Sequence, residues 1–147
     1  MSLVYANKIT SHQVITNFQM HELYTLIRTV YGEARGESLP GQGAVVHVIL
    51  NRVQKQREAW GLTVKEVCMK PKQFSFWDNP NVVEDITMEG NLAFVKNLIW
   101  AIHQWEIGWD FSYGATHYHT RTVSPKWAEG HKPCTIIGKH IFYNDIK

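Results

Sequence analysis

Residues 30–37 read Val-Tyr-Gly-Glu-Ala-Arg-Gly-Glu, and here an apolar helical pattern gives way to charged residues and glycines. Ahead of this stretch, apolar residues recur at the three- and four-residue spacing of one helix face: Leu23, Leu26, Ile27, Val30 and Ala34. Gly32 and Gly36 are expected to loosen the backbone where the helix ends. The pattern predicts a helix over about 17–31 that runs into two carboxylates.

A second helix is predicted directly afterwards, over residues 38–53, with Pro40 in its first turn. Its residues are nearly all apolar, which is typical of a helix buried on every side. We therefore expect Val45, Val48 and Ile49 to lie in the core.

Two further helices are predicted. Thr63 and Glu66 have the spacing of a capping box, and Pro71 ends the short helix that follows. From about residue 88 the 3.6-residue period returns, and Gly108 stands where a C-terminal glycine cap belongs. This last helix is predicted to be the longest.

The remaining segments are less regular. Residues 73–81 predict an irregular, aromatic-rich loop, whereas 114–122 and 134–143 have the residue types of short strands and predict a small sheet or hairpin. Residues 1–16 are polar and aperiodic, and we expect a surface arm. The fold class predicted is α+β and mainly helical.

Length and composition indicate one soluble domain over 1–147. Of the residues, 44% are hydrophobic and 19% charged, and the formal net charge is +2. No basic stripe predicts nucleic-acid binding, and no apolar stretch predicts membrane insertion. Cys68 and Cys134 cannot form a disulfide framework and are expected to be free.

Glu33 is the candidate for chemistry. A carboxyl at a helix end against apolar neighbours loses solvation, which raises its pKa and lets it act as a general acid near neutral pH. The alternative is a solvated Glu-Arg-Glu cluster in which Arg35 pairs weakly with an acid and nothing catalytic happens.

Several motifs carry a resemblance to the cell wall hydrolase family, which includes the spore cortex-lytic enzymes and related phage lysis enzymes. They are Y-G-E-A-R-G-E at 31–37, G-Q-G-A-V-V-H-V-I-L-N-R-V at 41–53, Gln73-Phe74-Ser75, Ala-Thr-His-Tyr-His at 115–119, Ser-Pro-Lys-Trp at 124–127 and Ile-Gly-Lys-His-Ile-Phe-Tyr at 137–143. The resemblance covers roughly residues 20–143. It implies a lysozyme-like core over 17–147.

The resemblance also implies a reaction and a site. It implies lytic transglycosylase chemistry on the MurNAc-GlcNAc β-1,4 bond of bacterial peptidoglycan, with Glu33 as the catalytic glutamate and no cofactor. The residues expected to contact the glycan are Arg35, Gln73, Phe74, Ser75, His117, Tyr118, His119 and Tyr143. His119 and Thr120 depart from the aromatic and Asn residues that the spore enzymes tend to have there.

Glu37 is the second carboxylate and leaves two mechanisms open. As a nucleophile or water activator it would make the enzyme a hydrolysing N-acetylmuramidase, since usual glycosidases need two carboxylates. As a support residue it would hold Arg35 or the neighbouring loop.

Two other classes of protein compete. A zinc amidase or endopeptidase is suggested by His117 and His119, which on a strand would share one face, with His131, Cys134 and His140 downstream. No His-Glu-x-x-His motif supports it, so no metal is expected. A carbohydrate-binding module is suggested by the six Trp and six Tyr residues.

The biological setting is a separate expectation. The first ten residues lack the charged start and apolar run of a signal peptide. We therefore expect a monomeric phage endolysin, made in the host cytoplasm and released to the cell wall by a holin.

Overall fold

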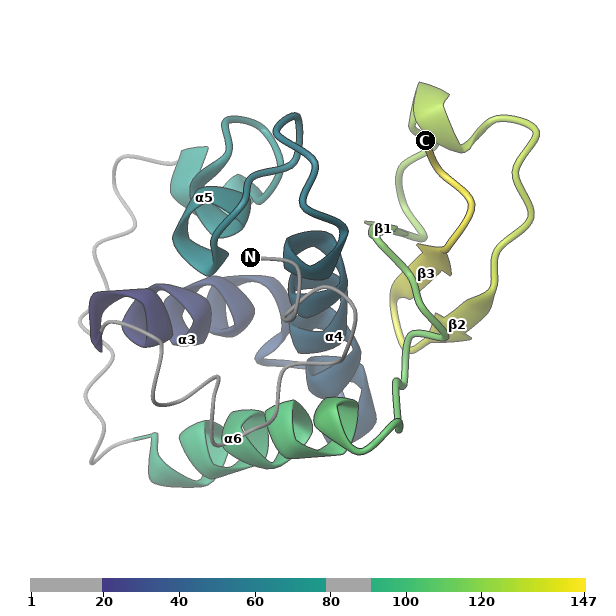
Figure 1. Cartoon of the computed structure of the whole chain (residues 1–147). Helices are drawn as coiled ribbons and strands as arrows, with labels where there is room; N and C mark the ends of the chain where they lie inside the picture. Colours follow the sequence, from purple (N-terminus) through teal and green to yellow (C-terminus); the bar gives the residue numbers. More distant parts are fainter. Residues whose placement is uncertain (1–19, 79–90) are drawn as a thin grey trace.

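Helices form the first part of the described chain and a small sheet the last part (Figure 1). The computed structural model describes residues 20–78 and 91–147. Within them the order is α3 (Met20–Ala34), α4 (Leu39–Lys55), α5 (Val64–Met69), the 3₁₀ turn η1 (Ser75–Asp78), α6 (Leu92–Glu106), β1 (His117–Thr120), the 3₁₀ turn η2 (Lys126–Ala128), β2 (Thr135–Ile137) and β3 (His140–Tyr143). The predicted mainly helical α+β class is confirmed.

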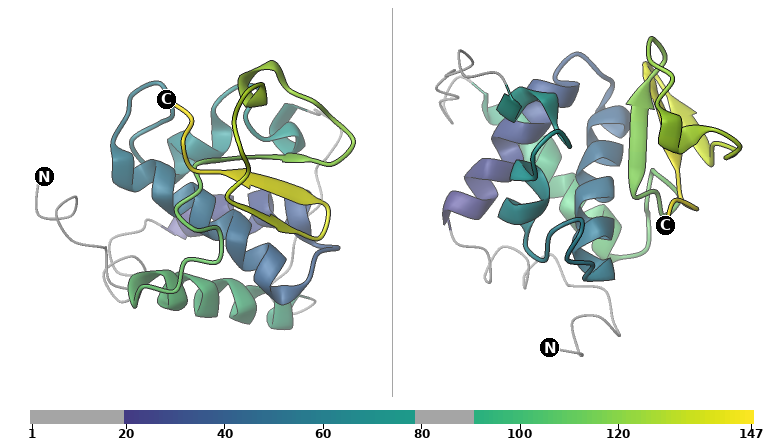
Figure 2. Two further views of the ribbon diagram at one scale, coloured as in Figure 1. Left: turned by 90° about the vertical axis from the view of Figure 1, so that its right-hand side faces the viewer. Right: turned by 90° about the horizontal axis from the view of Figure 1, so that it is seen from above.

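Helix α4 lies between the other helices and the sheet (Figure 2). The Ser38 side chain caps it by accepting a hydrogen bond from the Gly41 N–H at 3.2 Å, and Pro40 lies in the first turn. Every residue from Gly41 to Val53 is buried. The predicted core positions Val45, Val48 and Ile49 are all fully buried, so that prediction is confirmed.

Helix α3 continues to Ala34, beyond the predicted end near residue 31. Gly32 does not loosen it, because this glycine is inside the helix and touches η1. A Cβ on Gly32 would lie only 2.2 Å from a ring carbon of Phe76, so glycine allows the close approach of the two segments. The predicted start at 17–19 lies outside the described residues.

The α5 prediction is confirmed at its N-terminus, where the Thr63 hydroxyl accepts a hydrogen bond from the Glu66 N–H at 3.1 Å. The helix ends at Met69, ahead of Pro71. The segment predicted as an irregular loop contains η1, and residues 79–81 lie outside the described part.

Helix α6 was predicted to be the longest helix, and its length differs from that prediction. It has 15 residues, whereas α4 has 17, so α6 is not the longest of the described helices. Residues 88–90, where it was predicted to begin, are outside the described range. Gly108 follows with a φ of +101°, as expected for a glycine just past a helix end.

The sheet is antiparallel, with strand order β1-β3-β2. Tyr118 of β1 faces Phe142 of β3, and His117 faces Tyr143. Successive side chains of a strand point to opposite faces. Phe142 packs with Ala44 and Val48 of α4, so Tyr118 and Phe142 share the face that meets the helices.

Three smaller predictions have different outcomes. Cys68 and Cys134 are both free, as expected. The predicted surface arm at 1–16 falls outside the described residues. Among the residues that are described, no helix combines the length and apolar character needed to cross a bilayer.

Burial of α4 predicts the stability of core variants. Ile49 is fully buried, so Ile49→Ala should lower the free energy of unfolding by about 2–5 kcal/mol. Ile99 on α6 is 38% exposed, and Ile99→Ala should cost well under that range. Denaturant unfolding of both variants checks this, and equal midpoints would contradict the placement of α4 in the core.

Candidate active site

Two elements bring polar side chains to Glu33, in the last turn of α3. The Tyr118 hydroxyl of β1 donates a hydrogen bond to Oε1 at 3.0 Å. The Ser75 hydroxyl of η1 donates to Oε2 at 3.4 Å. Ser75 and Tyr118, both expected from the sequence to contact substrate, therefore lie at the candidate acid.

The environment of Glu33 raises the pKa of its carboxyl. Burial is the largest cause, because it penalises the charged form, and the charge of Asp78 acts in the same direction. The hydrogen bonds from Tyr118 and Ser75 oppose this, since they favour the carboxylate. Burial outweighs them, so Glu33 holds its proton at higher pH than an ordinary glutamic acid.

Tyr118 is fixed in place by the rings around it. Its ring centroid lies 4.7 Å from that of His140, 5.6 Å from Phe142 and 6.3 Å from Phe74. Burial and the neighbouring Glu33 raise the pKa of the Tyr118 hydroxyl well above its usual value, so it stays a donor. Phe74 is only 1% exposed, so this expected glycan contact packs beneath the site.

Arg52, which sequence reasoning did not single out, connects three segments from inside α4. Its Nε donates to the Thr116 carbonyl and its Nη1 donates to Oε1 of Gln73 at 3.1 Å. Burial lowers its pKa to about 10, which still leaves it charged near neutral pH. Gln73, an expected glycan contact, is thus bound to Arg52. The available signal was a cation, Arg52, within the apolar stretch of α4.

Glu37 is directed at the turn between β2 and β3. Its Oε1 accepts a hydrogen bond from the Lys139 N–H at 3.0 Å and lies 3.9 Å from Nδ1 of His140. Gly138 has a φ of +56°, and a Cβ there would lie 2.2 Å from the same oxygen. The Glu37 carboxylate therefore anchors this turn to the α3–α4 connection.

Arg35 is exposed, and its guanidinium carbon lies 5.0 Å from the centroid of the Tyr31 ring. Its carbonyl accepts a hydrogen bond from Nε2 of Gln42 at 3.3 Å. The backbone of Arg35 is thereby tied to α4, while its side chain lies over an α3 ring.

His117, His119 and Tyr143 lie on the sheet face opposite Tyr118. Nε2 of His119 accepts a hydrogen bond from the Tyr143 hydroxyl at 2.9 Å, and Nδ1 donates to the Thr120 carbonyl at 2.8 Å. Trp127 packs on all three rings. The structure therefore separates these three expected glycan contacts from Glu33, because residues 117 and 119 alternate with 118 along the strand.

Burial, with Arg52 and Arg57 nearby, lowers the pKa of His117 to about 4. His117 is therefore neutral near neutral pH. Across residues 20–78 and 91–147, no three His, Cys, Asp or Glu side chains are grouped so that they could hold a metal ion.

These features define a mainly helical α+β domain that carries a half-buried acid, Glu33, at a helix end. The chain belongs to the cell wall hydrolase family, which it matches over residues 36–143. The resemblance read from the motifs is thereby confirmed. Glu33 precedes the matched range, so its role stays a prediction.

Relatives of known name agree with this family. The chain is 33% identical to a spore cortex-lytic enzyme of Bacillus cereus over 132 residues, which cover 88% of this chain and 46% of that protein. It is 34% identical to the spore cortex-lytic enzyme of Bacillus subtilis over 128 residues, or 85% of this chain and 38% of that one. The chain thus spans less than half the length of these relatives.

Solved structures show the same fold. The catalytic domain of the Bacillus cereus SleB protein superimposes with a TM-score of 0.69 at 30% identity, covering 86% of this chain and 91% of that one. The catalytic domain of the germination-specific lytic transglycosylase SleB from Bacillus anthracis gives 0.69 at 31% identity, covering 86% and 96%.

The hydrogen bond from Tyr118 predicts how Glu33 titrates. Tyr118→Phe removes a donor that favours the carboxylate, so the pKa of Glu33 should rise further. NMR titration of ¹³C-labelled glutamate carboxyls measures this. Tyr143→Phe also removes a strand hydroxyl, but on the other sheet face, and should leave Glu33 unchanged. A fall in the pKa of Glu33 in Tyr118→Phe would contradict the assignment.

Proposed function

We propose that this chain cleaves the β-1,4 bond between MurNAc and GlcNAc in peptidoglycan, as a lytic transglycosylase with Glu33 as its acid. The observation that carries the proposal is the raised pKa of a half-buried carboxyl that accepts two side-chain hydrogen bonds. Membership of the cell wall hydrolase family supports the substrate class. The Bacillus anthracis relative is named a lytic transglycosylase, which supports the reaction.

In the proposed reaction, Glu33 first protonates the glycosidic oxygen as the C1–O bond breaks. The acetamido group of the muramoyl residue can stabilise the positive charge that develops at C1. The Glu33 carboxylate then takes the proton of the C6 hydroxyl as that oxygen bonds to C1. The products are a 1,6-anhydro end and a free 4-hydroxyl, and no water is consumed.

Tyr118 and Ser75 suit both stages of this cycle. Burial favours the protonated form of Glu33 before the reaction, and the two hydroxyls stabilise the carboxylate that proton transfer creates. Their donors are already in place, so little reorganisation accompanies the transfer. The single acid can thereby act first as donor and then as acceptor.

The second candidate is a hydrolase in which Glu37 activates water or acts as nucleophile. Its side chain is only 9% exposed, and Oε1 is engaged by the Lys139 N–H. These contacts favour a positioning role in which Glu37 holds the β2–β3 turn. We therefore propose the one-acid mechanism first.

The phage setting stays a prediction. The Bacillus cereus and Bacillus subtilis relatives are named spore cortex-lytic enzymes. An endolysin released by a holin, acting as a monomer, is the setting proposed from the sequence.

Loss of the acid should abolish lysis without abolishing wall binding. Glu33→Gln keeps the size of the side chain and removes the transferable proton, so the rate of wall lysis should fall by about 10²- to 10⁴-fold. Turbidity loss of purified peptidoglycan measures the rate, and co-sedimentation measures binding. Full lytic activity in Glu33→Gln would refute the site, whereas a parent protein that binds the wall without lysing it would indicate a carbohydrate-binding module.

Glu37→Gln is the matched carboxyl control in that experiment. If Glu37 positions the turn, its activity should fall less, and the fall should follow a lower unfolding midpoint. Mass spectrometry of the digests should show 1,6-anhydro ends. Reducing ends, together with a folded and inactive Glu37→Gln, would establish the two-carboxylate hydrolase instead.

Metal removal should leave activity unchanged. Glu33 chemistry uses proton transfer alone, so EDTA treatment followed by desalting should not slow wall lysis. Circular dichroism before and after treatment provides the control for folding. Loss of activity that zinc restores, with peptides as the cleaved product, would support the amidase or endopeptidase class.

A further inference from the structure

A groove with a volume of about 900 Å³ lies between the loop after α6, the start of α4 and strand β2. Its lining includes Pro40, Trp109, Phe111, Tyr113, Thr135 and Ile137. None of its lining residues is Glu33, Ser75 or Tyr118. The groove is therefore a concave surface whose side chains differ from those around Glu33.

Two large rings at this groove are held out in solvent. Trp109 is 66% exposed and Tyr113 is 68% exposed. Tyr113 also has a φ of +55°, in the left-handed region that L side chains rarely adopt. Such conformations are enriched at functional sites, and burial does not explain this one because the Tyr113 ring is exposed.

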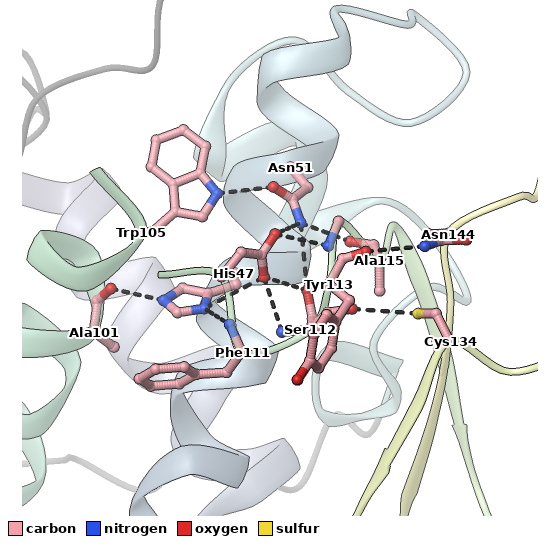
Figure 3. Close-up of polar contacts among 12 residues, drawn as sticks. His47, Asn51, Ala101, Trp105, Phe111, Ser112, Tyr113, Ala115, Cys134 and Asn144 are labelled. Carbon is pink, nitrogen blue, oxygen red and sulfur yellow. Dashed lines mark hydrogen bonds and ion pairs between the residues drawn. The ribbon is translucent and has the colours of Figure 1, made fainter. Parts of the chain in front are cut away.

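The loop that carries both rings is firmly attached to α4 (Figure 3). Nδ1 of His47 accepts a hydrogen bond from the Phe111 N–H at 3.0 Å, and Asn51 donates to the Ala115 carbonyl at 2.9 Å. The Tyr113 carbonyl accepts a hydrogen bond from Asn144 at 3.0 Å. The backbone that carries the exposed rings is therefore held in place before a ligand binds, which lowers the conformational entropy lost on binding.

The charge of the groove indicates what it can bind. Asp110 is the one charged residue in its lining, and its oxygens already accept hydrogen bonds from Asn51, Ser112 and Gly114. The lining has no basic side chain that could pair with the carboxylates of a peptide. What it offers instead is aromatic and apolar surface with the Thr135 hydroxyl, which suits an uncharged ligand with both C–H faces and hydroxyls.

We propose that this groove is an accessory binding site for a neutral stretch of β-1,4-linked N-acetylhexosamine glycan, stacked on Trp109 and Tyr113. The inference rests on the proposed function for its choice of polymer. It extends that function by adding a wall-binding site outside the catalytic one. The site would hold the enzyme on its insoluble substrate between cuts.

The test measures binding separately from cleavage. In a Glu33→Gln background, Trp109→Ala should weaken co-sedimentation with peptidoglycan and binding of a chitin hexamer by about tenfold. Trp109→Phe keeps a ring and should lose less. Leu92→Ala removes an apolar side chain that is 51% exposed on α6 and should bind like the parent.

Tyr113→Gly separates a binding role from a structural one. Glycine adopts a positive φ without strain, so the unfolding midpoint should stay the same or rise while glycan affinity falls. A structural role predicts a lower midpoint instead. Unchanged affinity in both Trp109→Ala and Tyr113→Gly would overturn the proposal.

Other occupants give different results. Loss of wall binding with unchanged binding of the chitin hexamer would mean that the groove takes peptide, and would overturn the proposal. A dimer that Trp109→Ala converts to monomer in analytical ultracentrifugation would mean a second copy of the chain, and would overturn it too. If Glu33→Gln proves fully active while Trp109→Ala loses glycan affinity, the groove stands and the catalytic assignment fails.

Discussion

Three polar side chains on the buried helix α4 fix the positions of its neighbours. His47 hydrogen-bonds to the Ala101 carbonyl of α6, Asn51 to the 110–115 loop, and Arg52 to the Thr116 carbonyl at the entry to β1. A buried polar group left without a partner costs about 1–3 kcal/mol. The helix is therefore stable in this environment only when α6, the loop and the sheet are all in their observed places.

The candidate acid depends on that arrangement. Arg52 holds the chain at Thr116, which fixes the sheet face to which each following side chain of β1 points. Tyr118 therefore points at Glu33. The ionisation of Glu33 is then set by a balance between loss of water and two hydroxyl donors. Neither contribution belongs to α3 alone, since the donors come from η1 and β1.

The small sheet has a role on each side of this arrangement. Strand β1 supplies Tyr118 to the acid, and β2 supplies Thr135 and Ile137 to the groove. Glu37 attaches the turn between β2 and β3 to the start of α4. The hydrogen bond between Glu37 and the Lys139 N–H thus helps to hold the sheet, which contributes to both the proposed catalytic site and the proposed glycan groove, next to α4.

The sequence by itself determined what depends on near neighbours. Helix spacing, Pro40 in the first turn of α4, the cap at Thr63, and an acid at an apolar helix end follow from local free energies. Only the tertiary structure decided which side chains meet, because Glu33 and Tyr118 are 85 residues apart in the chain. It likewise decided that His117 and His119 face away from the acid. A strand pattern shows that alternate residues share a face, but long-range packing selects the face that meets the helices.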